Sequence, residues 1–200
     1  MKIVIPTVQL LSITHEADEL IEEAGRTCYK SEGKIAEGTA APFCVSLMTR
    51  GHMSVLEHAS ATFRFVCDRG VTHELVRHRI ASYSQESTRY CNYGKTSNEI
   101  TVVQPPGLTT HDMFAAWACA CEQAERSYLS LIADGCPPQI ARSVLPTCLK
   151  TEIVTTANFR EWKHIFALRT SPKAHPQIKE IMDLAQIALH AHYPMIFPIQ

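Results

Sequence analysis

The sequence lacks a long hydrophobic run, although 46% of its 200 residues are apolar. A helix that crosses a membrane needs roughly 18 or more consecutive apolar residues, and no stretch of the chain approaches that length. The first residues, MKIVIPTVQLL, are interrupted by a proline and by the polar Thr7 and Gln9, and they lack a small-residue cleavage site. Because a secretory signal needs an apolar segment before such a site, we expect a cytoplasmic protein that does not contact membranes.

The sequence also has almost no excess charge of either sign. Its 19 Lys and Arg residues nearly balance 20 Asp and Glu residues, which gives a net charge of -1 and an isoelectric point near 6.8. Broad, non-specific binding of nucleic acids or anionic membranes requires a clear excess of positive charge. The balance argues against both kinds of partner, and it remains compatible with a local basic pocket.

Two common site motifs are missing. The eight cysteines include no C-x-x-C pair. A chain of this length and apolar content does not need disulfide bonds to stabilise its core, so we expect reduced thiols. No G-x-G-x-x-G occurs, and Gly70 stands alone before a predicted helix. The sequence therefore gives no support for a Rossmann dinucleotide site.

The periodicity of the apolar residues predicts a single domain, residues 1–200, that mixes helices and strands. Side chains alternate clearly in ATFRFVC, where Ala61, Phe63, Phe65 and Cys67 share one side of a strand. We expect strands at 2–10, 61–67, 99–104 and 151–157, and helices at 15–29, 41–51, 71–79, 111–134, 138–143, 159–168 and 176–191. Because these elements do not alternate as in βαβ units, they favour an α+β fold with a mixed or antiparallel sheet flanked by helices.

Two details of these helices are specific enough to test. Thr14 is the expected N-cap of the helix at 15–29, because a hydroxyl there can accept a hydrogen bond from the first turn. The helix at 111–134 carries the clearest apolar stripe in the chain. Its members are Phe114, Trp117, Ala118, Cys121, Ala124, Tyr128, Leu131 and Ile132.

The densest polar stretch is RHRIASYSQESTR, from Arg77 to Arg89, in a region rich in arginine. Between Arg64 and Arg89 the chain has five arginines and no lysine. A guanidinium group makes two-point contacts with phosphate or carboxylate groups, whereas lysine would serve solubility equally well. One interpretation is therefore an anion site completed by hydroxyl groups. The other is a solvated loop with surface ion pairs.

A second polar cluster, GHMSVLEH, precedes that stretch. His52, Glu57 and His58 could indicate a metal, but their spacing does not match H-E-x-x-H and no cysteine cluster accompanies them. A structural role near a helix end is the other interpretation of Glu57 and His58. His52 and Ser54 follow the helix-terminating Gly51 and are better placed to contact a ligand.

Together, these motifs resemble the flavin-dependent thymidylate synthase family. The signature of that family is R-H-R, seven residues and a serine, which here is Arg77-His78-Arg79 and Ser87. The other matching elements are His52-x-Ser54-x-x-Glu57-His58, Thr88-Arg89-Tyr90, Ala141-Arg142 with Leu145-Pro146, Asn158-Phe159-Arg160 and Ala167-Leu168-Arg169. The resemblance extends over nearly the whole chain, and its elements fall in the expected order.

The resemblance implies an enzyme that methylates dUMP to dTMP. The carbon would come from 5,10-methylenetetrahydrofolate, and the hydride from FAD that NADPH has reduced. It implies FAD contacts at Ser54, Arg77, His78, Arg79, Ile80, Asn158, Arg160 and His164. It implies dUMP contacts at Gln85, Glu86, Ser87, Arg89, Arg142 and Arg169. Because sites of this family are formed between subunits, we expect a homotetramer.

Catalytic roles in this reading fall to Arg169, Ser87 and His52, without a metal. Arg169 would hold the uracil edge, Arg142 the phosphate, and His52 would lie in the region of the folate and the flavin ring. A serine hydroxyl is a weak nucleophile unless a base activates it. No such base is identifiable, so Ser87 is not expected to be an obligatory nucleophile.

Several positions depart from the family pattern. Ser84-Gln85 stands where Asn-Glu is common, Gln139 where an acidic residue is often found, and His164 where asparagine is often found. Each replacement keeps hydrogen-bonding capacity but changes the charge or the donors. The resemblance to the family stands with these replacements, and it leaves the contact of each of these residues open.

The residues alone are also compatible with two other functions. A metal hydrolase would use His52, His58 and His78. A nucleic-acid-binding module would use the arginine-rich stretch, with Tyr83 and Tyr90 as stacking platforms for bases. The net charge of -1 does not favour the broad basic surface that this module needs.

Overall fold

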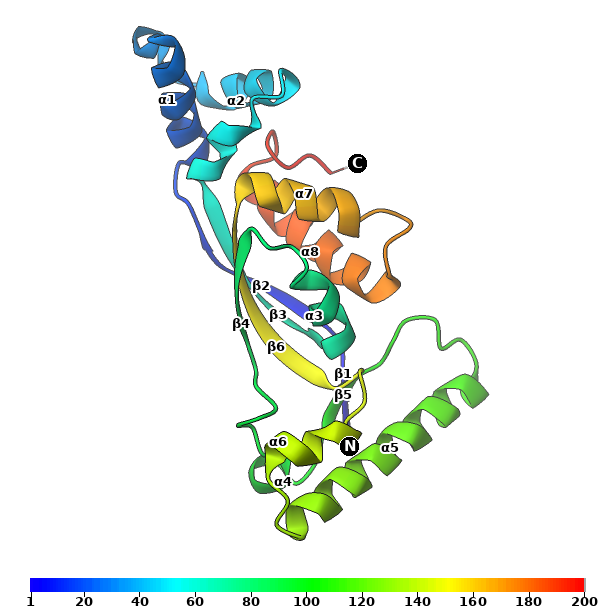
Figure 1. Ribbon diagram of the computed structural model, residues 1–200. Helices are drawn as coiled ribbons and strands as arrows, with labels where there is room; N and C mark the ends of the chain where they lie inside the picture. Colours follow the sequence, from blue (N-terminus) through cyan, green and yellow to red (C-terminus); the bar gives the residue numbers. More distant parts are fainter. Residues whose placement is uncertain (200) are drawn as a thin grey trace. The chain divides into compact units, whose positions relative to one another are not determined.

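The computed structural model describes residues 1–199 and combines helices with β-sheets (Figure 1), which confirms the α+β class. The strands are β1 (Lys2–Val4), β2 (Thr7–Ile13), β3 (Ser60–Asp68), β4 (Ala81–Gln85), β5 (Thr101–Val103) and β6 (Lys150–Asn158). The α-helices are α1 (Ala17–Tyr29), α2 (Ala40–Thr49), α3 (Arg69–Leu75), α4 (Tyr93–Thr96), α5 (His111–Ala133), α6 (Pro138–Ala141), α7 (Phe159–Arg169) and α8 (Pro176–His192). Short 3-10 helices are η1 (Glu32–Lys34), η2 (Met53–His58) and η3 (Arg142–Val144).

The chain forms two compact units. Unit 1 consists of Met1–Thr7, Phe65–Arg77 and Ser84–Ile153, and unit 2 consists of Val8–Arg64, His78–Tyr83 and Val154–Gln200. The R-H-R segment crosses from one unit to the other, with Arg77 in unit 1 and His78 in unit 2. The expectation that residues 1–200 are one domain stays a prediction.

Parallel and antiparallel pairing both occur. β1 and β5 pair in parallel, whereas the other strands form a sheet of order β2-β3-β6-β4. In this larger sheet the end of one strand meets the beginning of the next. The bonds that show it are Thr14 N to Ser60 O, Phe159 N to Ala59 O and Glu86 N to Glu152 O, at 3.0, 2.8 and 2.9 Å. The larger sheet is therefore antiparallel.

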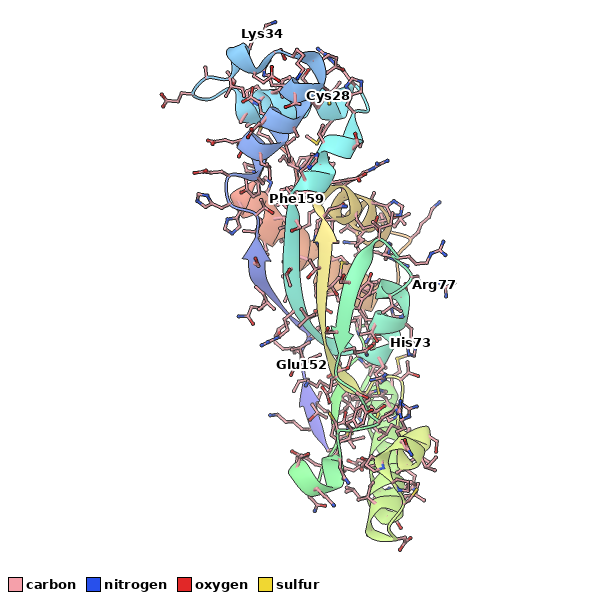
Figure 2. All side chains as sticks on the ribbon, turned by 60° about the vertical axis from the view of Figure 1, so that its left-hand side comes forward. Cys28, Lys34, His73, Arg77, Glu152 and Phe159 are labelled. Atoms are coloured by element: carbon pink, nitrogen blue, oxygen red, sulfur yellow. The ribbon has the colours of Figure 1, made fainter. Side chains whose placement is uncertain are left out.

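Unit 2 has an aromatic core. The alternation predicted in β3 buries Ala61 and Phe63, as well as Phe65 and Cys67 farther along the strand. Trp162 of α7 is fully buried, meets the Phe63 ring edge-on at 5.1 Å and donates a hydrogen bond from Nε1 to the Ala61 carbonyl at 3.0 Å. Because α7 follows β6 directly (Figures 1 and 2), this packing fixes the helix that carries several predicted site residues.

Unit 1 has a separate core around α5. Its buried members are Ile100, Val102, Cys121, Tyr128, Ala141 and Leu149. Only Cys121 and Tyr128 of the predicted stripe on α5 are fully buried, so most of that stripe is covered less than its periodicity indicated. At 23 residues α5 is long. Nevertheless, none of the helices within residues 1–199 is both long and apolar enough to cross a membrane.

The first predicted strand and the predicted cap of α1 are wrong. The strand expected at 2–10 is two strands, divided at Ile5-Pro6. Thr14 does not cap α1, because the N-cap position is Glu16 in a left-handed conformation. The Thr14 hydroxyl instead bonds the Ser60 backbone, accepting from its N–H at 2.9 Å and donating to its carbonyl at 3.2 Å.

The region around the R-H-R segment also differs from expectation. The helix expected at 71–79 is α3, which ends at Leu75, so the R-H-R residues follow the helix instead of continuing it. Its N-cap is Asp68, whose carboxylate accepts from Val71 N at 2.7 Å. β4 was not predicted, because the sequence ASYSQ is short and mostly polar and its serines resemble those of a loop.

We expect Trp162→Phe to lower the free energy of unfolding by about 2 kcal/mol, because it removes a buried hydrogen-bond donor and leaves a gap in the core. Urea denaturation followed by circular dichroism measures this. Trp117, the other tryptophan of the chain, is only half-buried on α5. Trp117→Phe is therefore the matched control, and a loss equal to that of Trp162→Phe would contradict the assignment.

Candidate functional site

A cavity in unit 2 collects three of the predicted site residues. It has a volume of about 370 Å³ and is lined by Gly25, Cys28, Tyr29, Leu47, Gly51, His52, Met53, Ser54, Val55 and Arg160. Gly51 follows α2 by two residues and has a φ of 76°, a conformation that favours glycine. The turn that follows starts η2 and brings His52 and Ser54 to the cavity.

Tyr29 is a cavity residue that the sequence did not reveal. Its hydroxyl lies 3.2 Å from His52 Nδ1, and the two rings stack with centroids 6.3 Å apart. Arg160 is paired with Glu57, a residue 103 positions earlier in the chain. Glu57 therefore forms an ion pair within the protein, which agrees with the structural role considered for it beside the metal site.

A second group in unit 2 surrounds His78, which is 5% exposed. Arg169 Nε donates to His78 Nε2 at 3.0 Å, and the Tyr83 hydroxyl donates to the His78 carbonyl at 2.7 Å. Glu161 Oε1 lies 3.7 Å from His78 Nδ1. The His164 ring meets the His78 ring edge-on, with centroids 5.8 Å apart.

These contacts keep His78 neutral. Burial, the Arg169 guanidinium and His164 together lower the pKa of His78 from 6.5 to about 4. Burial raises the pKa of Glu161, although His164 and Arg160 oppose that effect. At neutral pH the group therefore holds an uncharged imidazole beside a permanent cation.

The side chains around His78 could also be considered as ligands of a metal ion. One ligand atom each from His78, Glu161 and His164 lies within 4.8 Å of the others. However, the guanidinium of Arg169 already contacts His78 Nε2, and a fixed positive charge there repels a second cation. The metal hydrolase interpretation named His52 and His58 beside His78, and the structure does not group those residues with it.

Arg77 and Arg79 are exposed and have no counter-charge. Within residues 1–199 neither side chain makes an ion pair or a hydrogen bond, and Arg77 extends outward from the ribbon (Figure 2). Ile80, the next residue, is 69% exposed. Both arginines are thus solvated, as the loop interpretation expects, but the surface ion pairs of that interpretation are not found within residues 1–199.

Asn158 has a structural bond in addition to its predicted role. Its Oδ1 accepts from Glu161 N at 2.8 Å and so caps α7. The amide donors of the side chain remain for a ligand. His164, which replaces the asparagine of the family pattern, is exposed on the same helix.

Unit 1 contains all the predicted substrate residues except Arg169, and one of them, Arg142, lines a cavity of this unit. The cavity has a volume of about 260 Å³ and is lined by Arg69, His73, Thr88, Arg142, Ser143, Leu145, Pro146, Thr147 and Leu149. Arg142 Nη1 donates to Thr88 Oγ1 at 3.2 Å. Arg69 and His73 were not predicted. Arg69 and His73 are four residues apart on α3. This helical spacing places them on the same face and could have identified them as a pair from the sequence.

Glu86 and Gln85 are held by neighbouring side chains. Glu86 accepts from the Tyr93 hydroxyl at 2.7 Å and from Lys150 Nζ at 3.1 Å. Gln85 Nε2 donates to the hydroxyls of Thr72 and Thr151 at 3.0 and 3.3 Å. The amide of Gln85 therefore ties β4 to its surroundings, and only its carbonyl remains for a substrate.

Ser87 and Arg89 lie in the turn after β4. Ser87 Oγ accepts from Arg89 N at 3.3 Å, and no imidazole, amine or carboxylate of the described chain bonds this hydroxyl. The Arg89 guanidinium lies 5.5 Å from the centroid of the Tyr90 ring. Tyr90 is exposed, whereas Tyr83 is half-buried and its hydroxyl donates to the His78 carbonyl. The use of both rings as stacking platforms stays a prediction.

A solved structure with the same fold defines the class to which this architecture belongs. The UMP/dUMP methylase PolB from Streptomyces cacaoi, bound with 5-Br dUMP, superposes with a TM-score of 0.86 and covers 98% of this chain and 95% of that chain. The two sequences are 22% identical, so the likeness concerns the α+β fold.

Sequence comparison gives the family. The profile described as thymidylate synthase complementing protein matches residues 9–195. A flavin-dependent thymidylate synthase from Geobacter sulfurreducens is 36% identical over 181 residues, which cover 87% of this chain and 78% of that protein. A protein of the same name from Pyrococcus furiosus is 36% identical over 164 residues, which cover 81% of this chain and 67% of that protein. The chain belongs to the thymidylate synthase complementing protein family.

The neutral state of His78 predicts how stability changes with pH. Below pH 6.5 the unfolded chain protonates this histidine, whereas the folded chain does so only near pH 4. The free energy of unfolding should therefore fall, by about 3 kcal/mol, as the pH falls from 6.5 to 4.

Urea denaturation at several pH values tests this prediction against His78→Gln, which cannot titrate. Glu161, whose raised pKa acts in the opposite direction, is present in both proteins. The difference between the two proteins should shrink as the pH falls. A difference that stays constant from pH 7 to pH 4 would show that His78 titrates normally.

Proposed function

We propose that this chain is a flavin-dependent thymidylate synthase that methylates dUMP to dTMP. The carbon donor is 5,10-methylenetetrahydrofolate, and the reductant is NADPH acting through FAD. The observation that carries the proposal is the match of residues 9–195 to one family. Two relatives named flavin-dependent thymidylate synthase are each 36% identical to this chain. The exposed, unpaired arginines of the R-H-R segment support it, because the cofactor and the substrate are both anionic.

The residues present fit FAD. A pyrophosphate needs fixed positive donors, and Arg77 and Arg79 offer unpaired guanidinium groups. The cavity of about 370 Å³ adds an imidazole, a hydroxyl and a third guanidinium, and it is large enough for part of the cofactor. When bound, FAD supplies the hydride chemistry that protein side chains lack. We assign its contacts to Ser54, Arg77, His78, Arg79, Ile80, Asn158, Arg160 and His164.

The nucleotide substrate is assigned to a different set of residues. We propose that Arg142, which borders the cavity of unit 1, holds the phosphate of dUMP, and that the Thr88 hydroxyl keeps this guanidinium in place. Gln85, Glu86, Ser87 and Arg89 complete the contacts from the end of β4 and the turn after it. We further propose a homotetramer, in which residues of more than one subunit contact each substrate.

Arg169 is the proposed catalytic residue for the uracil ring. Reduction of the ring is easier when negative charge that develops on it is stabilised, and a fixed guanidinium does this best where water is excluded. The bond to His78 Nε2 holds Arg169 in one orientation. His52 is proposed to line the folate and flavin region. Ser87 is proposed to bind and not to act as a nucleophile, in agreement with the lack of a bonded base.

The proposed function predicts that the purified protein binds FAD with a typical oxidised flavin absorbance, which is lost on reduction by NADPH. It also predicts dTMP formation from dUMP only when methylenetetrahydrofolate is present. Absorbance spectra and a chromatographic dTMP assay measure both. A colourless protein that also fails to bind added FAD would falsify the proposal.

The role of Arg169 predicts that Arg169→Lys folds normally and retains FAD, but loses roughly a hundredfold or more in dTMP formation. Arg169 lies in the last turn of α7, where any cation interacts favourably with the helix dipole. Lysine keeps that interaction but cannot make a planar two-point contact. Arg126 is exposed on α5, and Arg126→Lys is therefore the control that should keep full activity. Near-normal turnover of Arg169→Lys, or simple unfolding, would show that Arg169 is only a helix cap.

A further inference from the structure

Glu161 is a buried carboxylate to which neither the motifs nor the proposed function gives a role. It is 7% exposed and lies in the first turn of α7. Burying a carboxylate is unfavourable unless a donor or a positive charge compensates it. Its position near the helix N-terminus provides some compensation. The side chain nevertheless turns toward His78, with Oε1 at 3.7 Å from Nδ1.

The proton positions around His78 follow from its other partner. The Nε of arginine always carries a hydrogen and has no acceptor capacity. Because Arg169 Nε lies 3.0 Å from His78 Nε2, His78 Nε2 must present a lone pair. A neutral imidazole that accepts at Nε2 carries its hydrogen on Nδ1, and this is the atom that faces Glu161.

We infer that Glu161 is a positioning residue, which holds His78 in the Nδ1–H tautomer and thereby fixes the direction of the Arg169 guanidinium. The inference rests on the proposed catalytic role of Arg169, and it adds Glu161 and His78 as the residues through which that role is set. Glu161, His78 and Arg169 form a chain from the first turn of α7 to the last, which we call the tautomer triad.

The alternative tautomer shows why the carboxylate matters. With hydrogen on Nε2, the ring would direct an N–H at the N–H of Arg169, and both donors would lose their partner. A buried donor without a partner costs about 1–3 kcal/mol. Without Glu161 the Nδ1–H loses the carboxylate that it faces, so the ring gains freedom to rotate or to change tautomer. Arg169 would then lose its fixed orientation.

The position of Arg169 is sensitive to such a change. A misplacement of a reacting or stabilising group by about 1 Å can lower turnover roughly a hundredfold. We therefore expect Glu161→Leu to lower kcat for dTMP formation by about tenfold to a hundredfold and to leave the KM for dUMP nearly unchanged. Glu161→Gln keeps an acceptor of the same shape and should retain most of the activity.

Two measurements test the triad. The first is NMR of the flavin-free protein with ¹⁵N-labelled histidine, where His78 is assigned by comparison with His78→Gln. The parent and Glu161→Gln should show the Nδ1–H tautomer, and Glu161→Leu a mixture of tautomers. An Nε2–H tautomer in the parent, or a spectrum unchanged in Glu161→Leu, would overturn the inference. This measurement does not depend on enzymatic activity.

The second measurement is a double-mutant cycle on kcat with Arg169→Lys. If Glu161 acts through Arg169, Glu161→Leu should cost at least tenfold in the parent but less than twofold when residue 169 is already lysine. Equal losses in both backgrounds would mean that Glu161 only stabilises α7, as any acidic residue in a first turn does. A parent protein without thymidylate synthase activity would overturn the proposed function, while the NMR measurement would still decide the tautomer of His78 and the effect of Glu161 on it.

Discussion

Arg169 has only hydrogen-bond donors and keeps its charge at every pH that a folded protein encounters. The group that it contacts, His78, must therefore stay uncharged and must offer a lone pair. Burial of the imidazole meets the first condition, and the carboxylate of Glu161 favours the second. The Tyr83 hydroxyl on the His78 carbonyl and the Asn158 cap on the Glu161 amide hold the backbone of both residues. The contact between Arg169 and His78 therefore depends on keeping this imidazole neutral and in one tautomer.

The arginines of the chain divide into those with a protein partner and those without one. Arg26 pairs with buried Glu22 one turn earlier on α1, and Arg160 pairs with Glu57, so both have a structural function. Arg77 and Arg79 have no such partner in the described chain. An unpaired guanidinium at the surface is tolerated because water solvates it, but five arginines without a lysine between Arg64 and Arg89 are more than solubility requires. We propose that an anionic ligand is the reason for this excess.

The sequence predicted what depends on local spacing and missed what depends on distant contacts. The alternation of Phe63 and Phe65 specified β3, and the periodicity of α7 specified the helix that carries Arg169. β4 was missed because its stability comes from pairing with β6 and not from its own residues. Tyr29, which reaches His52 from α1, and Glu161, which reaches His78, gave no sequence signal. Their partners come from other parts of the chain.

Glu86 is a carboxylate among the residues that we propose to contact dUMP, which is an anion. Alone, its negative charge would repel a phosphate, yet Lys150 lies 3.1 Å away and Tyr93 donates to it at 2.7 Å. Lys150 also pairs with Glu152 at 2.7 Å, so one ammonium group serves two carboxylates. Arg69, which lines the cavity of unit 1 together with Arg142, also donates from Nη1 to the Glu86 carbonyl at 3.5 Å. Arg77 and Arg79 differ from these residues, because within residues 1–199 their guanidinium groups are exposed and make no ion pair. We propose that an anionic ligand contacts them.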